Sequence, residues 1–124
     1  MNSSKLQNNF FLRIVAFVIT IALFVSLTVA KAEENRSFTL DLQNGHVAKN
    51  MKTITVTQGD RVELIWNVDK VTELHLHGYN IKLNVSPTRP ETMIFVANFA
   101  GRFPVSIHGS GSHGKVIYLE VYPR

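Results

Sequence analysis

Four of the five histidines lie at two places in the chain, and imidazole nitrogen is a common ligand for metal ions. His75 and His77 are two residues apart, so on a β-strand their rings would project from the same face. His108 ends a second apolar-alternating segment, and a glycine-rich loop after it could bring His113 back toward it. Four neutral imidazoles would complete a tetragonal or tetrahedral site for Cu(II), Zn(II) or Ni(II). The pattern predicts a metal site formed by these four residues.

A purely structural role is the alternative for each of these histidines. A lone histidine on a strand is usually a hydrogen-bonded residue at a sheet edge, and glycine-serine loops often serve only as connections. His46 follows an Asn-Gly turn and is expected to be exposed and outside the site. Met51 could add a thioether ligand, although a loop methionine more often packs at the rim of a core. One shared ion requires imidazoles of the first pair within roughly 5 Å of those of the second.

The composition excludes several other kinds of chemistry. The chain of 124 residues has no cysteine, which rules out disulfides, thiolate zinc sites, iron–sulfur clusters, a thiol nucleophile and a blue-copper centre. The serines at 106, 110 and 112 have histidine neighbours but lie in no nucleophile-elbow context, and the carboxylates are dispersed. We therefore expect the protein not to be an enzyme.

The first 32 residues have the pattern of an export signal. Residues 1–13 are polar with two cations, residues 14–30 are apolar and uncharged, and Ala30-Lys31-Ala32 resembles a signal peptidase site. The sequence predicts a signal peptide over residues 1–32 and a mature domain over residues 33–124. An uncleaved N-terminal anchor is the alternative, and only then would the chain contact a membrane. Both versions place the domain outside the cytoplasm, in the periplasm or secreted.

Charge does not favour a nucleic-acid partner. The whole chain has 13 Lys and Arg residues against nine Asp and Glu residues. Cleavage would remove Lys5, Arg13 and Lys31 but no acid, leaving a net charge near +1. The remaining cations are scattered, so no basic patch that could bind DNA or RNA is expected.

Residues 33–124 show the period-two alternation of half-buried strands, interrupted by turn signals rich in glycine and proline. Seven to eight short strands predict an all-β Greek-key sandwich with antiparallel pairing, in which Trp66 and Met93 belong to the core. A short helix near residues 68–71 is left open. The candidate strands are residues 36–43, 52–57, 61–67, 73–77, 79–85, 92–98, 102–108 and 115–122.

Three segments of this pattern resemble a known superfamily. They are residues 54–64, with the sequence ITVTQGDRVEL, residues 75–81, with HLHGYNI, and residues 100–109, with AGRFPVSIHG. In this order they are similar to the cupredoxin-like superfamily, in particular the EfeO-type and plastocyanin-like domains of exported bacterial proteins. The resemblance covers nearly all of residues 33–124 and implies a cupredoxin-like fold.

The same resemblance implies a site without the cysteine and methionine ligands of the blue-copper members. In blue-copper members the first histidine ligand lies in the region of His75 or His77, and the second matches His108 or His113. Val105, Ser106 or Ile107 stands where those members have cysteine, and no methionine follows. Without a thiolate, type 1 electron transfer is not expected.

Two main functions follow as hypotheses. The first is an exported cupredoxin-fold protein that binds copper, or alternatively zinc, through His75, His77, His108 and His113 for copper binding, delivery or tolerance. The second is a metal-free interaction module of the same fold that supports a membrane or periplasmic protein partner. A weaker third possibility is electron transfer by a non-blue copper site.

Overall fold

The computed structural model describes residues 3–25, 33–109 and 113–124. The chain divides into two compact units, Met1–Ala32 and Glu33–Arg124. The first contains α1 (Ser3–Val25), and no helix among the described residues is long and apolar enough to cross a membrane. The predicted cleavage site, Ala30-Lys31-Ala32, lies outside the described residues, so the signal peptide stays a prediction.

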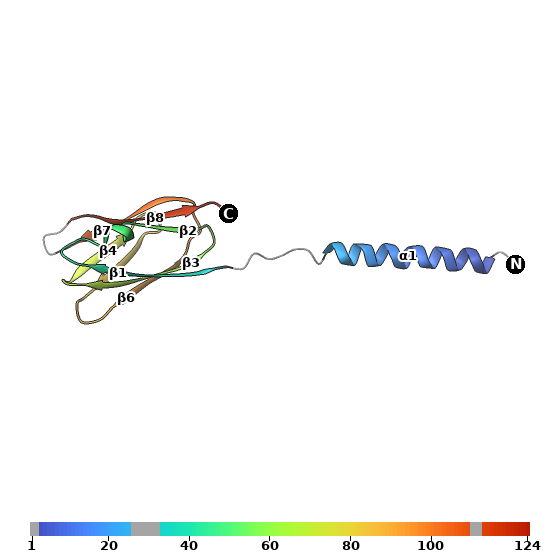
Figure 1. Cartoon of the computed structure of the whole chain (residues 1–124), viewed down its shortest axis with the longest axis horizontal. Coiled ribbons are helices and arrows are strands. Elements are labelled where there is room, and N and C mark those ends of the chain that lie inside the picture. Colours follow the sequence, from blue (N-terminus) through green and yellow to red (C-terminus); the bar gives the residue numbers. More distant parts are fainter. Residues whose placement is uncertain (1–2, 26–32, 110–112) are drawn as a thin grey trace. The chain divides into compact units, whose positions relative to one another are not determined.

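The second unit is a sandwich of two sheets, whose strands are drawn as arrows in Figure 1. One sheet has the order β1-β3-β6 and the other the order β2-β8-β7-β4-β5. The predicted β-sandwich is thereby confirmed. The strands are β1 (Asn35–Leu42), β2 (Thr53–Thr57), β3 (Arg61–Val68), β4 (Thr72–Leu76), β5 (Ile81–Val85), β6 (Glu91–Val96), β7 (Gly101–His108) and β8 (Gly114–Tyr122).

Alternation along each strand sends one set of side chains into the space between the sheets. On β3, Val62, Leu64, Trp66 and Val68 are all buried, and the residues between them are half-buried. Met93 on β6 is also buried, as expected from the sequence. The cluster of side chains that packs between the sheets is hydrophobic. The polar side chains therefore lie mostly on the outward faces.

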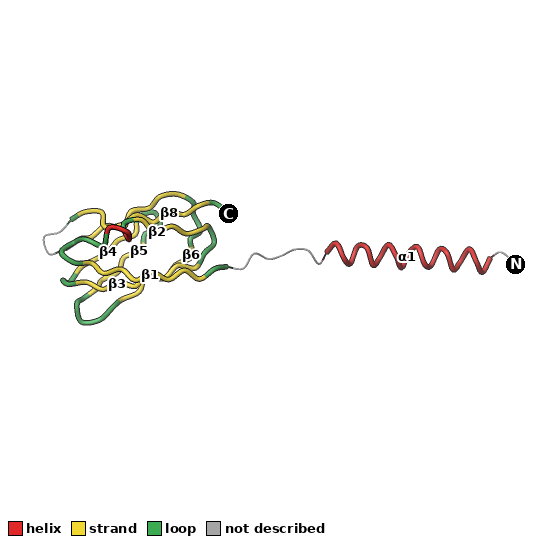
Figure 2. Tube along the Cα trace, viewed as in Figure 1, coloured by secondary structure: helices red, strands yellow, loops and turns green. Residues whose placement is uncertain are grey.

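The expected antiparallel pairing is wrong for two pairs of strands. β1 pairs with β3, and β2 pairs with β8, in the parallel sense. β1 and β3 lie in one sheet, and β2, which comes between them in the sequence, lies in the other. The chain therefore reverses direction twice between β1 and β3, so these two strands run parallel. The short helix left open at residues 68–71 is absent there because β3 continues to Val68. A 3₁₀ turn, η1 (Lys49–Met51), lies elsewhere and is the short red segment among the strands in Figure 2.

Strand register separates two ends of the sandwich. At one end of the β7–β8 pair, Gly101 lies opposite Val121, and at the other end Ile107 lies opposite Gly114. Asp60, in the turn between β2 and β3, belongs to the first end, because the neighbouring Thr57 pairs with Tyr122. The histidines of β4 and β7 lie toward the second end.

Asp60 is the one buried polar or charged residue among those described, with 1% of its surface exposed. Its carboxylate accepts hydrogen bonds from the backbone nitrogen of Thr57 at 2.9 Å and from Nη2 of Arg124 at 3.0 Å. Nε of Arg36 lies 3.6 Å from Oδ2. This Asp60 network ties the turn between β2 and β3 to side chains from both ends of the domain sequence.

Candidate metal centre

β4 and β7 are antiparallel neighbours, and their register decides which histidines can meet. His75 lies directly opposite Ser106, and Glu73 lies directly opposite His108. Leu74 on β4 is buried, as are the residues on either side of Ser106. The histidines therefore occupy the outward face of the five-stranded sheet, as period-two alternation requires.

The structure brings three of the four predicted ligands together. One ring nitrogen from each of His75, His77 and His108 can be chosen so that all three lie within 4.8 Å of one another. The ring centroids of His75 and His77 are 4.1 Å apart, and those of His75 and His108 are 6.2 Å apart. Two nitrogens bound to one ion at about 2.0 Å are separated by at most about 4 Å, so small rotations of the rings would close this three-histidine group on a metal.

Two contacts from β7 hold His77, which is the first residue after β4. Its backbone nitrogen donates to the carbonyl oxygen of Pro104 at 3.0 Å. Its Nε2 lies 3.0 Å from the hydroxyl oxygen of Ser106. The next residue, Gly78, has φ +83°, and an added Cβ there would collide with the ring of Phe103. A side chain at position 78 would therefore disturb the turn that carries His77.

The surroundings of His77 favour the neutral form of its ring. Burial lowers the pKa of His77 below the ordinary value of 6.5, and the positive charges of His75, His108 and Lys115 lower the pKa further. A neutral imidazole has the lone pair that a metal ion needs. His77 thus resists protonation at a position where its ring could bind a cation.

His113 lies next to this group but not within it. It immediately precedes β8, and its ring centroid is 6.1 Å from that of His108. Both rings are exposed. The serines of the loop, at positions 110 and 112, lie outside the described residues. A fourth bond from His113 would require its exposed ring to move toward the three-histidine group.

The other two residues considered from the sequence lie apart from the group. His46 is exposed, as expected, and its backbone forms a bridge with Gln43. It borders a surface hollow of about 320 Å³ that His113 and Lys115 also line. Met51 is partly buried and packs against the core, so it has the rim-packing role given as the alternative to a ligand.

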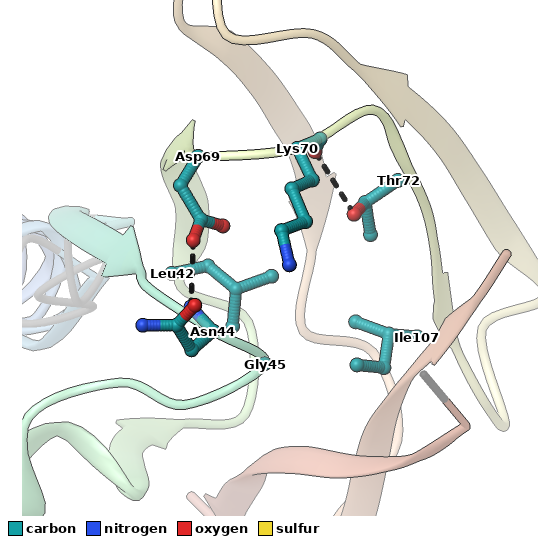
Figure 3. A pocket seen from close by; sticks show the side chains of 7 residues that line it. All are labelled: Leu42, Asn44, Gly45, Asp69, Lys70, Thr72 and Ile107. Carbon is teal, nitrogen blue, oxygen red and sulfur yellow. Dashed lines mark hydrogen bonds between the residues drawn. The ribbon is translucent and has the colours of Figure 1, made fainter. Parts of the chain in front are cut away.

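A smaller hollow of about 80 Å³ at the same end is a poor cation site. Its single carboxylate, on Asp69, accepts a hydrogen bond from the backbone nitrogen of Asn44 at 2.8 Å, and Lys70 contributes a positive charge (Figure 3). This charge would oppose a metal ion. Its lining residues are Leu42, Asn44, Gly45, Asp69, Lys70, Thr72 and Ile107.

Ser106 is the residue that sequence reasoning left without a role in metal binding. Its spacing of two residues from His108 puts both on one strand face. Its contact with His77, however, depends on pairing between segments 29 residues apart. A β-bulge at Val105 and Ser106 also shifts the register with β8. Neither feature has a local sequence signal.

No family model and no curated protein matches the sequence. Solved structures do match. A chain of a heme-copper terminal oxidase dimer is 15% identical with a TM-score of 0.55, over 93% of this chain and 98% of its own. A copper binding protein in its apo form is 10% identical with a TM-score of 0.56, over 73% and 91%. The periplasmic domain of cytochrome oxidase subunit II (CoxB) from Bradyrhizobium japonicum is 12% identical with a TM-score of 0.58, over 74% and 87%.

At these identities the likeness establishes architecture and not activity. The two sheets, their strand order and these neighbours agree with the fold that the sequence motifs imply. The sequence also contains no cysteine. Residues 33–124 therefore form a cupredoxin-like β-sandwich that lacks the thiolate of a type 1 copper centre.

Proposed function

We propose that this is an exported protein that binds Cu(II) through His75, His77 and His108, and that it serves copper binding, delivery or tolerance. The observation that carries the proposal is the approach of three imidazoles from two strands to within 4.8 Å on one sheet face. Imidazole suits Cu(II) and also Zn(II), which is the alternative ion. His113 is the proposed fourth ligand, because its ring is next to that of His108.

Export is part of the same proposal. The signal pattern of residues 1–32 supports it, as does the similarity to a domain described as periplasmic. A histidine site without a thiolate is not suited to type 1 electron transfer, and no catalytic constellation was found in the sequence. We therefore propose binding rather than catalysis.

Titration of the purified protein with Cu(II), followed by electron paramagnetic resonance, tests this function. We expect one tightly bound copper per chain, nitrogen hyperfine structure, and no intense blue absorption. His77→Ala and His108→Ala should each weaken binding by at least about 100-fold, since loss of a ligand should exceed the 10–100-fold cost of losing an outer-shell partner. His46→Ala is the matched control and should leave the affinity unchanged.

Acidification provides a second test of imidazole ligation. Ligating histidines must be unprotonated, so affinity should fall steeply as the pH drops through about 6. Full affinity retained well below that pH would contradict histidine ligation. Copper binding by the wild type that equals that of a His75→Ala, His77→Ala, His108→Ala triple variant would contradict the whole site.

One comparison favours a second candidate function. The match to a chain of a heme-copper terminal oxidase dimer extends over 93% of this chain and 98% of the other. A metal-free cupredoxin-like module that supports a membrane or periplasmic partner would be compatible with that likeness. Absence of any copper or zinc binding by the wild type would favour this candidate over the first.

A further inference from the structure

We infer that Ser106 is a positioning residue that holds the His77 ring so that Nδ1, and not Nε2, binds the metal. The inference rests on the proposed copper site. Its structural basis is the 3.0 Å contact between Nε2 of His77 and the hydroxyl oxygen of Ser106. Both side chains are half-buried, so water competes less for this bond than it would at an exposed position.

The chemistry of imidazole excludes double use of Nε2. Each ring nitrogen either carries a hydrogen or offers one lone pair. If Nε2 of His77 donates to Ser106, it has no lone pair for a metal; if it accepts from Ser106, its lone pair is already occupied. While the bond persists, Nδ1 is the nitrogen that remains for a metal ion. It can serve as a ligand only if the ring hydrogen is on Nε2, so the hydroxyl oxygen of Ser106 must be the acceptor.

The strand places the Ser106 side chain on the same face as the histidines. The residues on either side of it, Val105 and Ile107, are buried in the core, which directs the Ser106 hydroxyl to the outward face. Directly opposite Ser106 lies His75, whose ring is 4.1 Å from that of His77. The hydroxyl therefore lies beside the rings of His75 and His77.

Contacts from β7 thus hold both the backbone and the ring of His77. The carbonyl oxygen of Pro104 accepts from the His77 backbone nitrogen, and Ser106, two residues later, contacts the ring. Hydrogen bonds to the second nitrogen of a ligating histidine commonly fix its tautomer and orientation. Removing the hydroxyl should free ring rotation while leaving the strand pairing in place.

Nitrogen NMR of the histidine side chains in the metal-free protein gives the first readout. We expect His77 to carry its hydrogen on Nε2 in the wild type and in Ser106→Thr, and to lose this preference in Ser106→Ala. Added Zn(II), which is diamagnetic, should then perturb Nδ1 of His77 in the wild type. A hydrogen on Nδ1, or zinc bound at Nε2, would overturn the inference.

Copper affinity gives the second readout. Ser106→Ala should bind Cu(II) about 10–100-fold more weakly, as for other outer-shell partners of metal-bound histidine. Ser106→Thr should restore most of the affinity, and Ser37→Ala, a matched change on an exposed position of β1, should change nothing. Unchanged or tighter binding by Ser106→Ala would overturn the inference and leave the copper site standing. A wild type that binds neither copper nor zinc would overturn both.

Discussion

The Asp60 network and the three-histidine group lie toward opposite ends of the sandwich. They differ in how deeply their ionisable groups are buried and in whether these groups form ion pairs. Asp60 is almost wholly buried, and its two carboxylate oxygens are occupied by a backbone nitrogen and two arginines. The histidines are half-buried or exposed. Within the described part of the chain, no carboxylate forms an ion pair with any of the three.

This difference separates a structural site from a binding site. A buried charge must have its partners within the chain, because leaving it unpaired costs several kcal/mol. A cluster of imidazoles at the surface needs no partner for folding, since water can serve its nitrogens. Glu73, which lies opposite His108 in the register, has its carboxylate 3.8 Å from Lys82 instead. We therefore expect stability to depend on the Asp60 network and metal affinity on the three-histidine group.

The largest effect on stability should come from Asp60→Ala. We expect the free energy of unfolding to fall by about 3 kcal/mol, at the lower end of the range for breaking a buried ion pair, because both arginines still reach solvent. Denaturant unfolding measures this loss. Glu34→Ala is the control: it removes an exposed acid 3.0 Å from Arg36 and should cost less than about 1 kcal/mol.

The same variant also tests the separation of the two regions. The folded fraction of Asp60→Ala should bind Cu(II) with the affinity of the wild type. Loss of copper binding in protein that is still folded would show that the two ends of the sandwich are coupled, and would contradict the comparison.

Local pattern was sufficient to predict most of the sandwich. The segment predicted at residues 61–67 is β3 (Arg61–Val68), and the one predicted at 102–108 lies within β7 (Gly101–His108). Period-two alternation is a strong local signal, because each strand buries one face. The parallel pairs were not predictable in this way, because pairing sense depends on how the chain passes between sheets, and no short segment records that path.

For the candidate site, as for the fold, the sequence predicted local features but not how distant segments pair. The shared face of His75 and His77 follows from their spacing alone, and so does the shared face of Ser106 and His108. The meeting of these two pairs follows from the register of β4 against β7, which the sequence does not state. His113 shows the limit most clearly: proximity along the chain placed it near His108 but not within the group.

Gly78→Ala should have a smaller effect on stability than Asp60→Ala, and it should affect copper binding as well. This position has φ +83° and lies against the Phe103 ring, so alanine adds both backbone strain and a collision. We expect a loss of about 1–3 kcal/mol in unfolding free energy, together with weaker copper binding, because His77 is adjacent.

Gly109→Ala separates strain from collision. Gly109 has φ +116°, but an added Cβ there would meet no atom of the described residues within 4 Å. Its stability loss should be smaller than that of Gly78→Ala in the same unfolding experiment. Equal losses in the two variants would mean that the Phe103 contact contributes nothing.

The pH dependence of stability should show a still smaller effect from His77. Because its pKa is lowered in the folded protein, the unfolded chain binds more protons once the pH falls below about 6.5. Stability should therefore decline from pH 6.5 down to the folded pKa, and the effect should vanish above 6.5. Unfolding curves of metal-free wild type and His77→Gln measure it. The variant should lose less stability on acidification, and parallel pH profiles would contradict the lowered pKa.

The smallest effect on stability is expected at Trp66, which belongs neither to the Asp60 network nor to the three-histidine group. Trp66 is fully buried, and its Nε1 has no hydrogen-bond partner among the described residues. Trp66→Phe leaves a cavity, but it also removes an unsatisfied donor whose burial costs about 1–3 kcal/mol. These contributions oppose each other, so the net change in unfolding free energy should be below about 1 kcal/mol. Phe95→Leu, which also removes ring atoms from the core but relieves no polar group, should cost more. If Trp66→Phe proves the more damaging change, the cost of its cavity exceeds the gain from removing the unsatisfied donor, and the two contributions do not balance as expected.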